Sequence, residues 1–390
     1  MVLILYQQAK KSGSMSTKTK QKKVSVKLIM ILLGGFTLLV RFFFSSNPSI
    51  TEAAYSRGIF RLIRFGFDYT IALLPIPLLY ILLALLLLVD VIWLIRRNKA
   101  RKQYPPQKAP FRTRLLKGLF SVAAVVGAVI FLFYFLWAFN YERLPIEELI
   151  QIKPVPLTAD DIRREADLAF HKLVQSRQEI PGVADLGNND LDERFLPSDW
   201  ETSTRDSLEK VLKSMDYPAP GRVRVKKLWT AGVMMSLGGS GLYFPFTGEA
   251  YIPEDLTPVE IPFLAAHEMA HGYGIAQEGT ANFLAYLACI SSSDPFIAYS
   301  GNLVYFTHIM RDLKRVSEKE YGEYHKQLPP GITADMWKQY KNWEKYRGWL
   351  MDLSAKAYDG YLKTQGVSEG IKSYDRLVVL AAAWRKAGKN

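Results

Sequence analysis

The residues best suited to chemistry lie between His267 and Asn282, where the chain reads His-Glu-Met-Ala-His and then passes through a glycine-rich turn. On an α-helix, His267 and His271 are four residues apart and project from the same face, so both imidazoles can bind one metal ion. The helical period of 3.6 residues rotates Glu268 by about 100° from His267 and places its carboxylate beside the metal. That position suits a general base acting on a metal-bound water.

A reversal of the chain can return a third ligand to the two histidines. Pro262 suits the first turn of the helix, and Gly272 and Gly274 favour its end and the turn that follows. A second helix that starts near Glu278 brings a carboxylate back, which completes a His₂Glu set with one open position for water. Gln277 is a weaker alternative ligand because its side chain is neutral and binds zinc poorly. The pattern predicts one Zn²⁺ per chain.

Three further residues are candidates for supporting roles. Asn282 lies four residues after Glu278 on the same helix face, where it can hydrogen-bond to a ligand histidine. Tyr374 and His308 are candidate donors to an oxyanion opposite the metal, although a structural role is the simpler interpretation of both. The two histidines of the motif can also be ordinary core residues, but two well-placed glutamates and a glycine reversal argue against that interpretation.

The elements that must position these residues form a mainly helical α+β domain over residues 140–390. Helical spacing or an acidic first turn predicts helices over 160–176, 259–272, 278–291, 299–321, 333–364 and 373–387. Short strands bounded by turn residues are expected over 222–228, 241–246 and 250–252. The run Gly-Gly-Ser-Gly at 238–241 lacks the Gly-Lys-Ser/Thr ending of a phosphate loop and therefore predicts a turn.

Three apolar runs organise the first third of the chain, over 28–44, 69–95 and 115–139. Their length and hydropathy predict three transmembrane helices, so membrane lipid is an expected partner. Lysine and arginine outnumber acidic residues by 20 to 3 up to Phe139, and the basic residues concentrate before the first run and between the second and third. The positive-inside rule then places residues 1–27 in the cytoplasm and residues 140–390 outside it. Met15 is a second plausible start.

Composition excludes several classes of function. The net charge of +13 comes from the membrane region, so it does not indicate a nucleic-acid partner. Cys289 is the only cysteine, which excludes an intramolecular disulfide and a cysteine-based metal cluster. Aromatic residues recur among lysines and arginines over 337–349, where helix packing or contact with the membrane surface is a better interpretation than base stacking.

The metal-binding stretch resembles the zincin metallopeptidases. Gly274 occupies the turn position of the HExxHxxG metzincin pattern, and Glu278 with Asn282 resembles the Glu-x-x-x-Asp/Asn pair of gluzincins, so neither large family is matched in full. Longer motifs resemble a bacterial membrane-protein family catalogued as domain of unknown function 3810. They read FLWAFNYERLP, GLYFPFTGEA, AHEMAHGYGIAQEGTANFLAYL and GIKSYDRLV. This resemblance implies three spans, a zincin-like fold and a metal, and supplies no substrate.

These observations predict a zinc-dependent peptidase of the cytoplasmic membrane, which hydrolyses a peptide or protein substrate outside the cytoplasm. Zn²⁺ held by His267, His271 and Glu278 would activate a water, with Glu268 as the base. The alternative is a non-catalytic envelope protein that uses the same fold as a binding or sensing module. Proteolysis within the membrane is disfavoured because the motif lies far along the chain from the last span.

Overall fold

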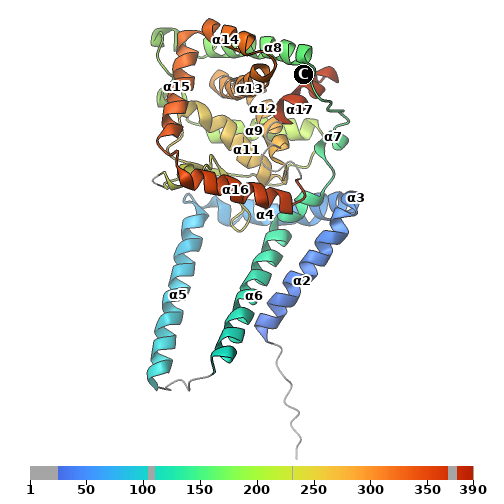
Figure 1. The fold of residues 1–390 in the computed structure, drawn as a ribbon, viewed down its shortest axis with the longest axis vertical. Coiled ribbons are helices and arrows are strands. Elements are labelled where there is room, and N and C mark those ends of the chain that lie inside the picture. The colour runs from blue at the N-terminus through green and yellow to red at the C-terminus, as the bar shows by residue number, and fades with distance from the viewer. Residues whose placement is uncertain (1–24, 104–109, 231, 368–375, 390) are drawn as a thin grey trace, which may run out of the picture. The chain divides into compact units, whose positions relative to one another are not determined.

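The computed structural model describes residues 25–103, 110–230, 232–367 and 376–389. The described chain is mainly helical, with three helices long and apolar enough to cross a membrane. These candidate spans, labelled in Figure 1, are α2 (Val26–Ser45), α5 (Leu78–Gln103) and α6 (Phe111–Leu136). The second begins nine residues later than the hydropathy suggested, because Pro75 and Pro77 precede it and lack the N–H groups that a helix interior needs.

The chain divides into two compact units. One consists of the residues up to Leu38 together with Lys108–Phe131, and the other of Leu39–Gln107 with Leu132–Asn390. In the first unit, α2 and α6 approach closely at glycines, because a Cβ added to Gly34 would lie 2.5 Å from the Cα of Gly127. Small residues at such a crossing let two helix backbones pack directly, as is common between membrane helices.

In the second unit, four short helical elements join α2 to α5. They are α3 (Pro48–Ile50), the π-helix η1 (Thr51–Ile59), α4 (Phe60–Asp68) and the 3₁₀-helix η2 (Ile71–Leu73). After α6 come η3 (Ala138–Glu142), α7 (Ile146–Leu149), α8 (Ala159–Gln178), η4 (Val183–Leu186), η5 (Glu193–Phe195) and α9 (Trp200–Ser214). Thr158 and Asp161 start α8 with a reciprocal capping box, which satisfies backbone N–H groups at its first turn.

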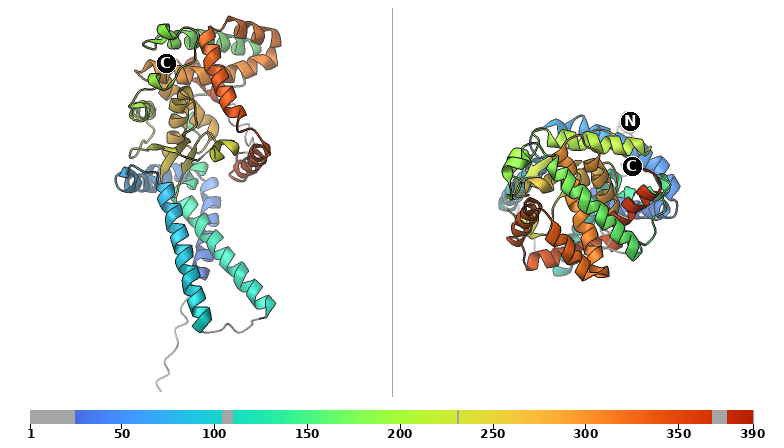
Figure 2. Two further views of the ribbon diagram at one scale, coloured as in Figure 1. Left: turned by 90° about the vertical axis from the view of Figure 1, so that its left-hand side faces the viewer. Right: turned by 90° about the horizontal axis from the view of Figure 1, so that it is seen from above.

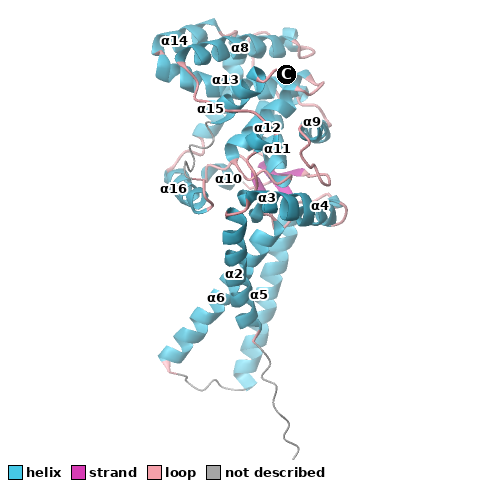
Figure 3. Ribbon diagram, turned by 90° about the vertical axis from the view of Figure 1, so that its right-hand side faces the viewer, coloured by secondary structure: helices cyan, strands magenta, loops and turns pink. Residues whose placement is uncertain are grey.

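A small mixed sheet follows α9. Its strands are β1 (Val225–Leu228), β2 (Leu242–Phe244) and β3 (Glu249–Pro253), in the order β1-β3-β2. β3 is parallel to β1 and antiparallel to β2, with Tyr243 paired with Ala250. The short helix α10 (Val233–Ser236) lies between β1 and β2 in the sequence. Every residue of β3 is buried because α11 packs on the sheet; Figure 3 shows the strands between α11 and α4.

Helices make up the described chain after the sheet. They are η6 (Pro258–Glu260), α11 (Ile261–Gly272), α12 (Glu278–Ile290), α13 (Pro295–Val316), α14 (Glu318–Gln327), α15 (Pro330–Glu344), α16 (Trp349–Thr364) and α17 (Arg376–Lys386). The hydrophobic core lies where α8 and α12 pack against α13, and the right-hand view of Figure 2 shows α8 crossing α13.

Two of the expected helices are divided. The helix expected over 299–321 breaks at Ser317, whose extended backbone and hydroxyl cap begin α14. The helix expected over 333–364 breaks before Gly348, which is also extended, and resumes as α16. Periodicity alone missed both breaks because the residues on either side continue a helical pattern.

Candidate metal centre

Two consecutive helices, α11 and α12, carry the three predicted ligands. A capping box between Thr257 and Glu260 starts η6, which leads directly into α11. Gly274 has a φ of 89° in the turn between α11 and α12, and a Cβ there would lie 2.9 Å from the ring of Phe60. A glycine is required at this position for both reasons. The turn lets α12 start at Glu278 and return its carboxylate to α11.

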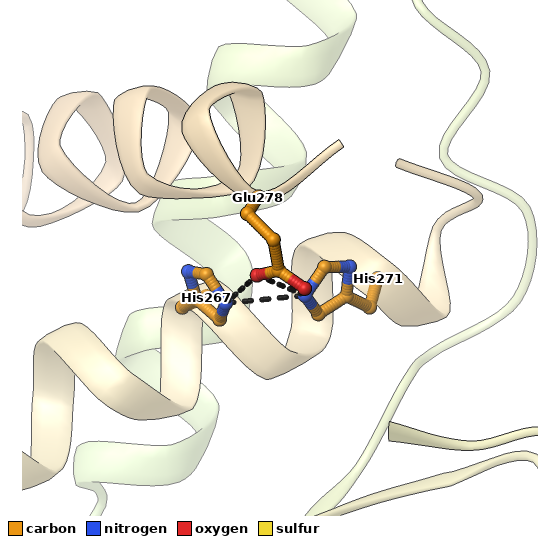
Figure 4. A group of neighbouring side chains, drawn as sticks. All are labelled: His267, His271 and Glu278. Atoms are coloured by element: carbon orange, nitrogen blue, oxygen red, sulfur yellow. Dashed lines mark hydrogen bonds and ion pairs between the residues drawn. The ribbon is translucent and has the colours of Figure 1, made fainter. Parts of the chain in front are cut away.

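The three side chains converge on one point, as Figure 4 shows. The Nε2 atoms of His267 and His271 lie 3.1 Å apart. Oε2 of Glu278 lies 3.1 Å from the first Nε2 and 3.3 Å from the second. These are the spacings that a tetrahedral zinc shell needs, since zinc–ligand bonds of 2.0–2.1 Å place neighbouring ligand atoms about 3.3 Å apart. The three residues could therefore hold one divalent metal ion, because two imidazoles and a carboxylate are donors that such ions accept.

Neighbouring groups orient two of these ligands. Nδ1 of His271 lies 2.7 Å from the carbonyl oxygen of Ile275, which directs its Nε2 atom toward the cluster. The hydroxyl of Tyr358 on α16 donates to Oε1 of Glu278, the oxygen that faces away from His267. The indole N–H of Trp137 donates to the backbone carbonyl of His271 at 2.7 Å, directly after the end of α6.

The electrostatics of the cluster favour a cation at its centre. Burial lowers the pKa of His271, but the carboxylate of Glu278 raises it by more, so that the pKa rises to about 9. Burial likewise disfavours the charged form of Glu278, and the histidines overcome it and hold the pKa of this carboxyl well below its usual range. Without a metal, the cluster holds a proton between an imidazole and a carboxylate. A divalent metal would replace that positive charge.

Glu268 lies beside the cluster rather than in it, as the helical spacing predicts. The backbone of Tyr243 on β2 hydrogen-bonds to its carboxylate, and burial raises its pKa above the ordinary value while His267 and His271 oppose the rise. A Cβ added to Gly241 would lie 2.2 Å from Oε1 of Glu268. The glycine at the start of β2 is therefore what allows this carboxylate to lie against the strand.

The remaining residues considered from the sequence are Asn282, Gln277, His308 and Tyr374. Asn282 is buried on α12, one helical turn after Glu278, and its contact with a ligand histidine stays a prediction. Gln277 precedes α12 and accepts a hydrogen bond from Thr280, so it lies outside the ligand set. His308 lies half-buried on α13, where burial and the charge of Arg311 lower its pKa to about 4. Tyr374 lies outside the residues that the structure describes.

Three residues at the site were not identified as site residues from the sequence. Tyr358 reaches Glu278 from α16, eighty residues away, and its local pattern is only that of an amphipathic helix. Trp137 looks like an interfacial aromatic, which gives no sign of its bond to His271. Gly241 belongs to a run that predicts a turn, and a glycine directly before a strand was the one available signal of a close approach.

Comparison with known proteins identifies the family. Residues 55–382 match the profile of a family described as protein of unknown function, DUF3810. No curated protein and no solved structure matches the chain. The family match includes α5, α6 and the whole His267–Glu278 cluster, and it confirms the resemblance noted in the longer motifs. Because this match covers most of its length, the chain belongs to the DUF3810 family.

Proposed function

We propose that this protein is a membrane-anchored, zinc-dependent peptidase with a zincin-like catalytic domain. The observation that carries the proposal is the mutual spacing of 3.1–3.3 Å among three ligand atoms, with a buried carboxylate at the next helical position. Two imidazoles and one carboxylate leave a position open for water or substrate, which is the ligand set of catalytic zinc sites rather than structural ones.

Each residue of the site has its own role in the proposed peptide hydrolysis. When bound by His267, His271 and Glu278, Zn²⁺ supplies a Lewis acid that polarises the scissile carbonyl and lowers the pKa of water. Glu268 takes the proton of the attacking water and delivers it to the leaving amine. Burial raises the pKa of Glu268, which suits this role because a more strongly acidic carboxyl would be a weaker base toward the attacking water. Tyr358 holds Glu278 in its binding position.

The charge distribution of the chain supports a topology for this enzyme. Lysine and arginine cluster before α2 and between α5 and α6, which favours the cytoplasm for both regions. With α2, α5 and α6 crossing the cytoplasmic membrane, the metal centre lies outside the cytoplasm.

One observation favours a second candidate, a non-catalytic binding or sensing module. The three ligands and Glu268 are each at most 7% exposed, so a substrate can enter only if a covering element moves. A sensing module would need the metal and the closed site but no general base.

Two substitutions separate these functions. Glu268→Gln keeps the three ligands and is nearly isosteric, so the variant should bind zinc normally and lose about 10²–10⁴-fold in peptidase turnover. His271→Ala removes a ligand and should lose most of the zinc, while substitution of the exposed His171 should change neither property. Zinc is measured by elemental analysis of the purified protein, and turnover by comparing envelope peptide profiles of cells carrying each variant.

Unchanged zinc in His271→Ala would overturn the metal site. Indistinguishable peptide profiles for the parent and Glu268→Gln, with both proteins folded and zinc-loaded, would favour the binding module.

A further inference from the structure

The segment between the first two candidate spans, residues 48–76, has its polarity reversed relative to a surface helix of a water-soluble protein. Its buried face carries Glu52, Arg64 and Asp68, none more than 5% exposed. Its exposed large apolar side chains include Ile50, Ile59, Leu62, Phe65, Leu73 and Ile76, with Leu62 at 76% exposure. Among the described side chains of this segment, Arg61 is the one charged residue classed as exposed. Such a surface suits lipid rather than water.

The buried Arg64 and Asp68 bond to each other and to backbone groups of Gly248 and Arg222, which fixes the orientation of the segment. The guanidinium of Arg64 pairs with Asp68 and donates to the carbonyl oxygen of Gly248 at 2.7 Å. Asp68 also accepts the backbone N–H of Arg222 at 2.9 Å. Rotating the apolar face inward would break these contacts and leave charges buried without partners, which costs several kcal/mol per ion.

The segment lies in the sequence directly between two candidate spans. α2 ends at Ser45 and α5 begins at Leu78, so if both cross the bilayer, the segment between them starts and finishes at the same membrane surface. The hydroxyl of Tyr55, in η1, donates to the carbonyl oxygen of Phe135 at 2.9 Å, near the end of α6. The segment therefore also contacts the C-terminal end of α6, the third candidate span.

The polar face of the same segment contacts the framework of the metal centre. Arg143 forms an ion pair of 2.7 Å with Glu52 and donates to the carbonyl oxygen of Gly274, in the turn between the two ligand helices. Arg64 donates to the hydroxyl of Tyr243, the residue whose backbone bonds Glu268. These contacts fix the position of the segment relative to the candidate metal site. A membrane surface in contact with the segment would therefore lie at a fixed distance from that site.

We propose that residues 48–76 lie flat in the headgroup region of a phospholipid bilayer, with Leu62 and Phe65 toward the acyl chains, and thereby hold the metal centre at the membrane surface. The partner is the lipid itself. An amphipathic helix of this kind buries its apolar face about 5–10 Å into the interface, and the long stem of Arg61 lets its charge reach the headgroups. The proposal depends on the three spans and not on catalysis.

Depth-dependent fluorescence quenching tests this placement in the full chain reconstituted into phosphatidylcholine–phosphatidylglycerol nanodiscs. Leu62→Cys and Phe65→Cys are labelled separately with a small fluorophore; Cys289 is fully buried and stays in place. Nitroxide lipids labelled near the headgroup should quench both positions about twofold more than lipids labelled deep in the chain, and aqueous iodide should quench them weakly. Leu87→Cys on α5 is the control for deep placement, and the exposed Val155→Cys is the control for water.

Two results would overturn the proposal. Labels at 62 and 65 that iodide quenches as strongly as the label at 155 would place the segment in water. Labels protected from both iodide and nitroxide lipids would show that protein covers this face, either a second copy of the chain or another membrane protein. Neither readout uses metal or turnover, so failure here is separate from failure of the peptidase proposal.

Discussion

At the scale of single residues, the cluster at His267, His271 and Glu278 holds a proton where the proposed metal ion would bind. His271 and Glu278 share a proton strongly enough to raise the histidine pKa to about 9. Metal ligands must be deprotonated to bind, so each metal bound by the protein at neutral pH displaces this proton.

The apparent zinc affinity should therefore rise with pH. Below a pKa of about 9 for His271, the release of one proton predicts roughly a tenfold gain per pH unit, and the gain should level off near pH 9. Competition titrations against a zinc indicator at pH 6, 7 and 8 measure this slope after correction for the pH dependence of the indicator. A flat profile would mean that the cluster holds no proton in its metal-free state.

Gly241 allows a second test at this scale, which rests on the proposed peptidase activity. Because a Cβ at Gly241 would collide with the carboxylate of Glu268, Gly241→Ala should displace the base and leave the three ligands in place. We expect normal zinc content and a loss of turnover of about tenfold or more. Gly360→Ala on α16, where a Cβ meets nothing within 4 Å, is the matched control and should change neither.

At the scale of elements, α16 is a helix distant in sequence that contacts the ligand set through Tyr358. Tyr358 bonds Glu278, while Tyr361, one turn later, lies 3.2 Å from the hydroxyl of Tyr141. Near the end of the helix, Gln365 accepts a hydrogen bond from Tyr134 of α6. Four tyrosines, Tyr358 and Tyr361 on α16 with Tyr134 and Tyr141 at and beyond the end of α6, thus connect the candidate metal centre to the third candidate span.

Tyr358→Phe should weaken zinc binding because it removes the hydroxyl that orients Glu278. Loss of such a supporting hydrogen bond typically costs about 10–100-fold in metal affinity, and the ring itself can still stack on Tyr361. Tyr340→Phe, at an exposed position on α15, serves as the control for a generic loss of a phenol. Equal zinc affinity in the Tyr358→Phe variant and the parent would show that the hydroxyl of Tyr358 does not position Glu278.

The sequence predicted the parts of this site that depend on neighbours in the chain. Helical spacing placed His267, His271 and Glu268, and a glycine turn returned Glu278, because all four lie on two consecutive helices. Hydropathy likewise located the three candidate spans. Tyr358 could not be found in this way, because its contact joins distant parts of the chain through tertiary packing.

The segment over 48–76 shows a different reason for failure. The sequence does not reveal which face of a helix meets protein. Only the structure shows that Arg64 and Asp68 are buried while Leu62 is exposed. Buried charges beside exposed apolar residues reverse the usual rule that apolar residues lie inside, so a helical pattern alone cannot assign the two faces.

At the scale of the whole molecule, residues before the domain boundary expected at residue 140 contact the framework of the candidate metal centre. Glu52 neutralises Arg143, Arg64 supports β2 through Tyr243, and Trp137 binds the carbonyl of His271. All three come from residues before 140. Removing them leaves the buried guanidinium of Arg143 without its carboxylate. Deleting one partner of a buried ion pair lowers the free energy of unfolding by about 3–5 kcal/mol.

A fragment of residues 140–390 should therefore fail to fold as a soluble zinc protein. The lost ion pair alone is a large share of the roughly 5–15 kcal/mol by which domains are stable, and the surface left by Trp137 and Arg64 adds to it. Size-exclusion chromatography and zinc analysis of the fragment and of the detergent-solubilised full chain compare the two. A monodisperse fragment with one bound zinc would contradict this expectation.

If the three candidate spans insert into a membrane, the bond from Trp137 to His271 implies an order of events during biosynthesis. Trp137 follows the last residue of α6 directly, so its indole reaches the ligand helix only when that span has ended at its final place. Glu52 and Arg64 lie between the first two candidate spans, so their positions would likewise depend on the insertion of both. A newly made chain would then complete the candidate metal site only after its spans had inserted, because the ligand helices depend on residues that lie beside those spans in the sequence.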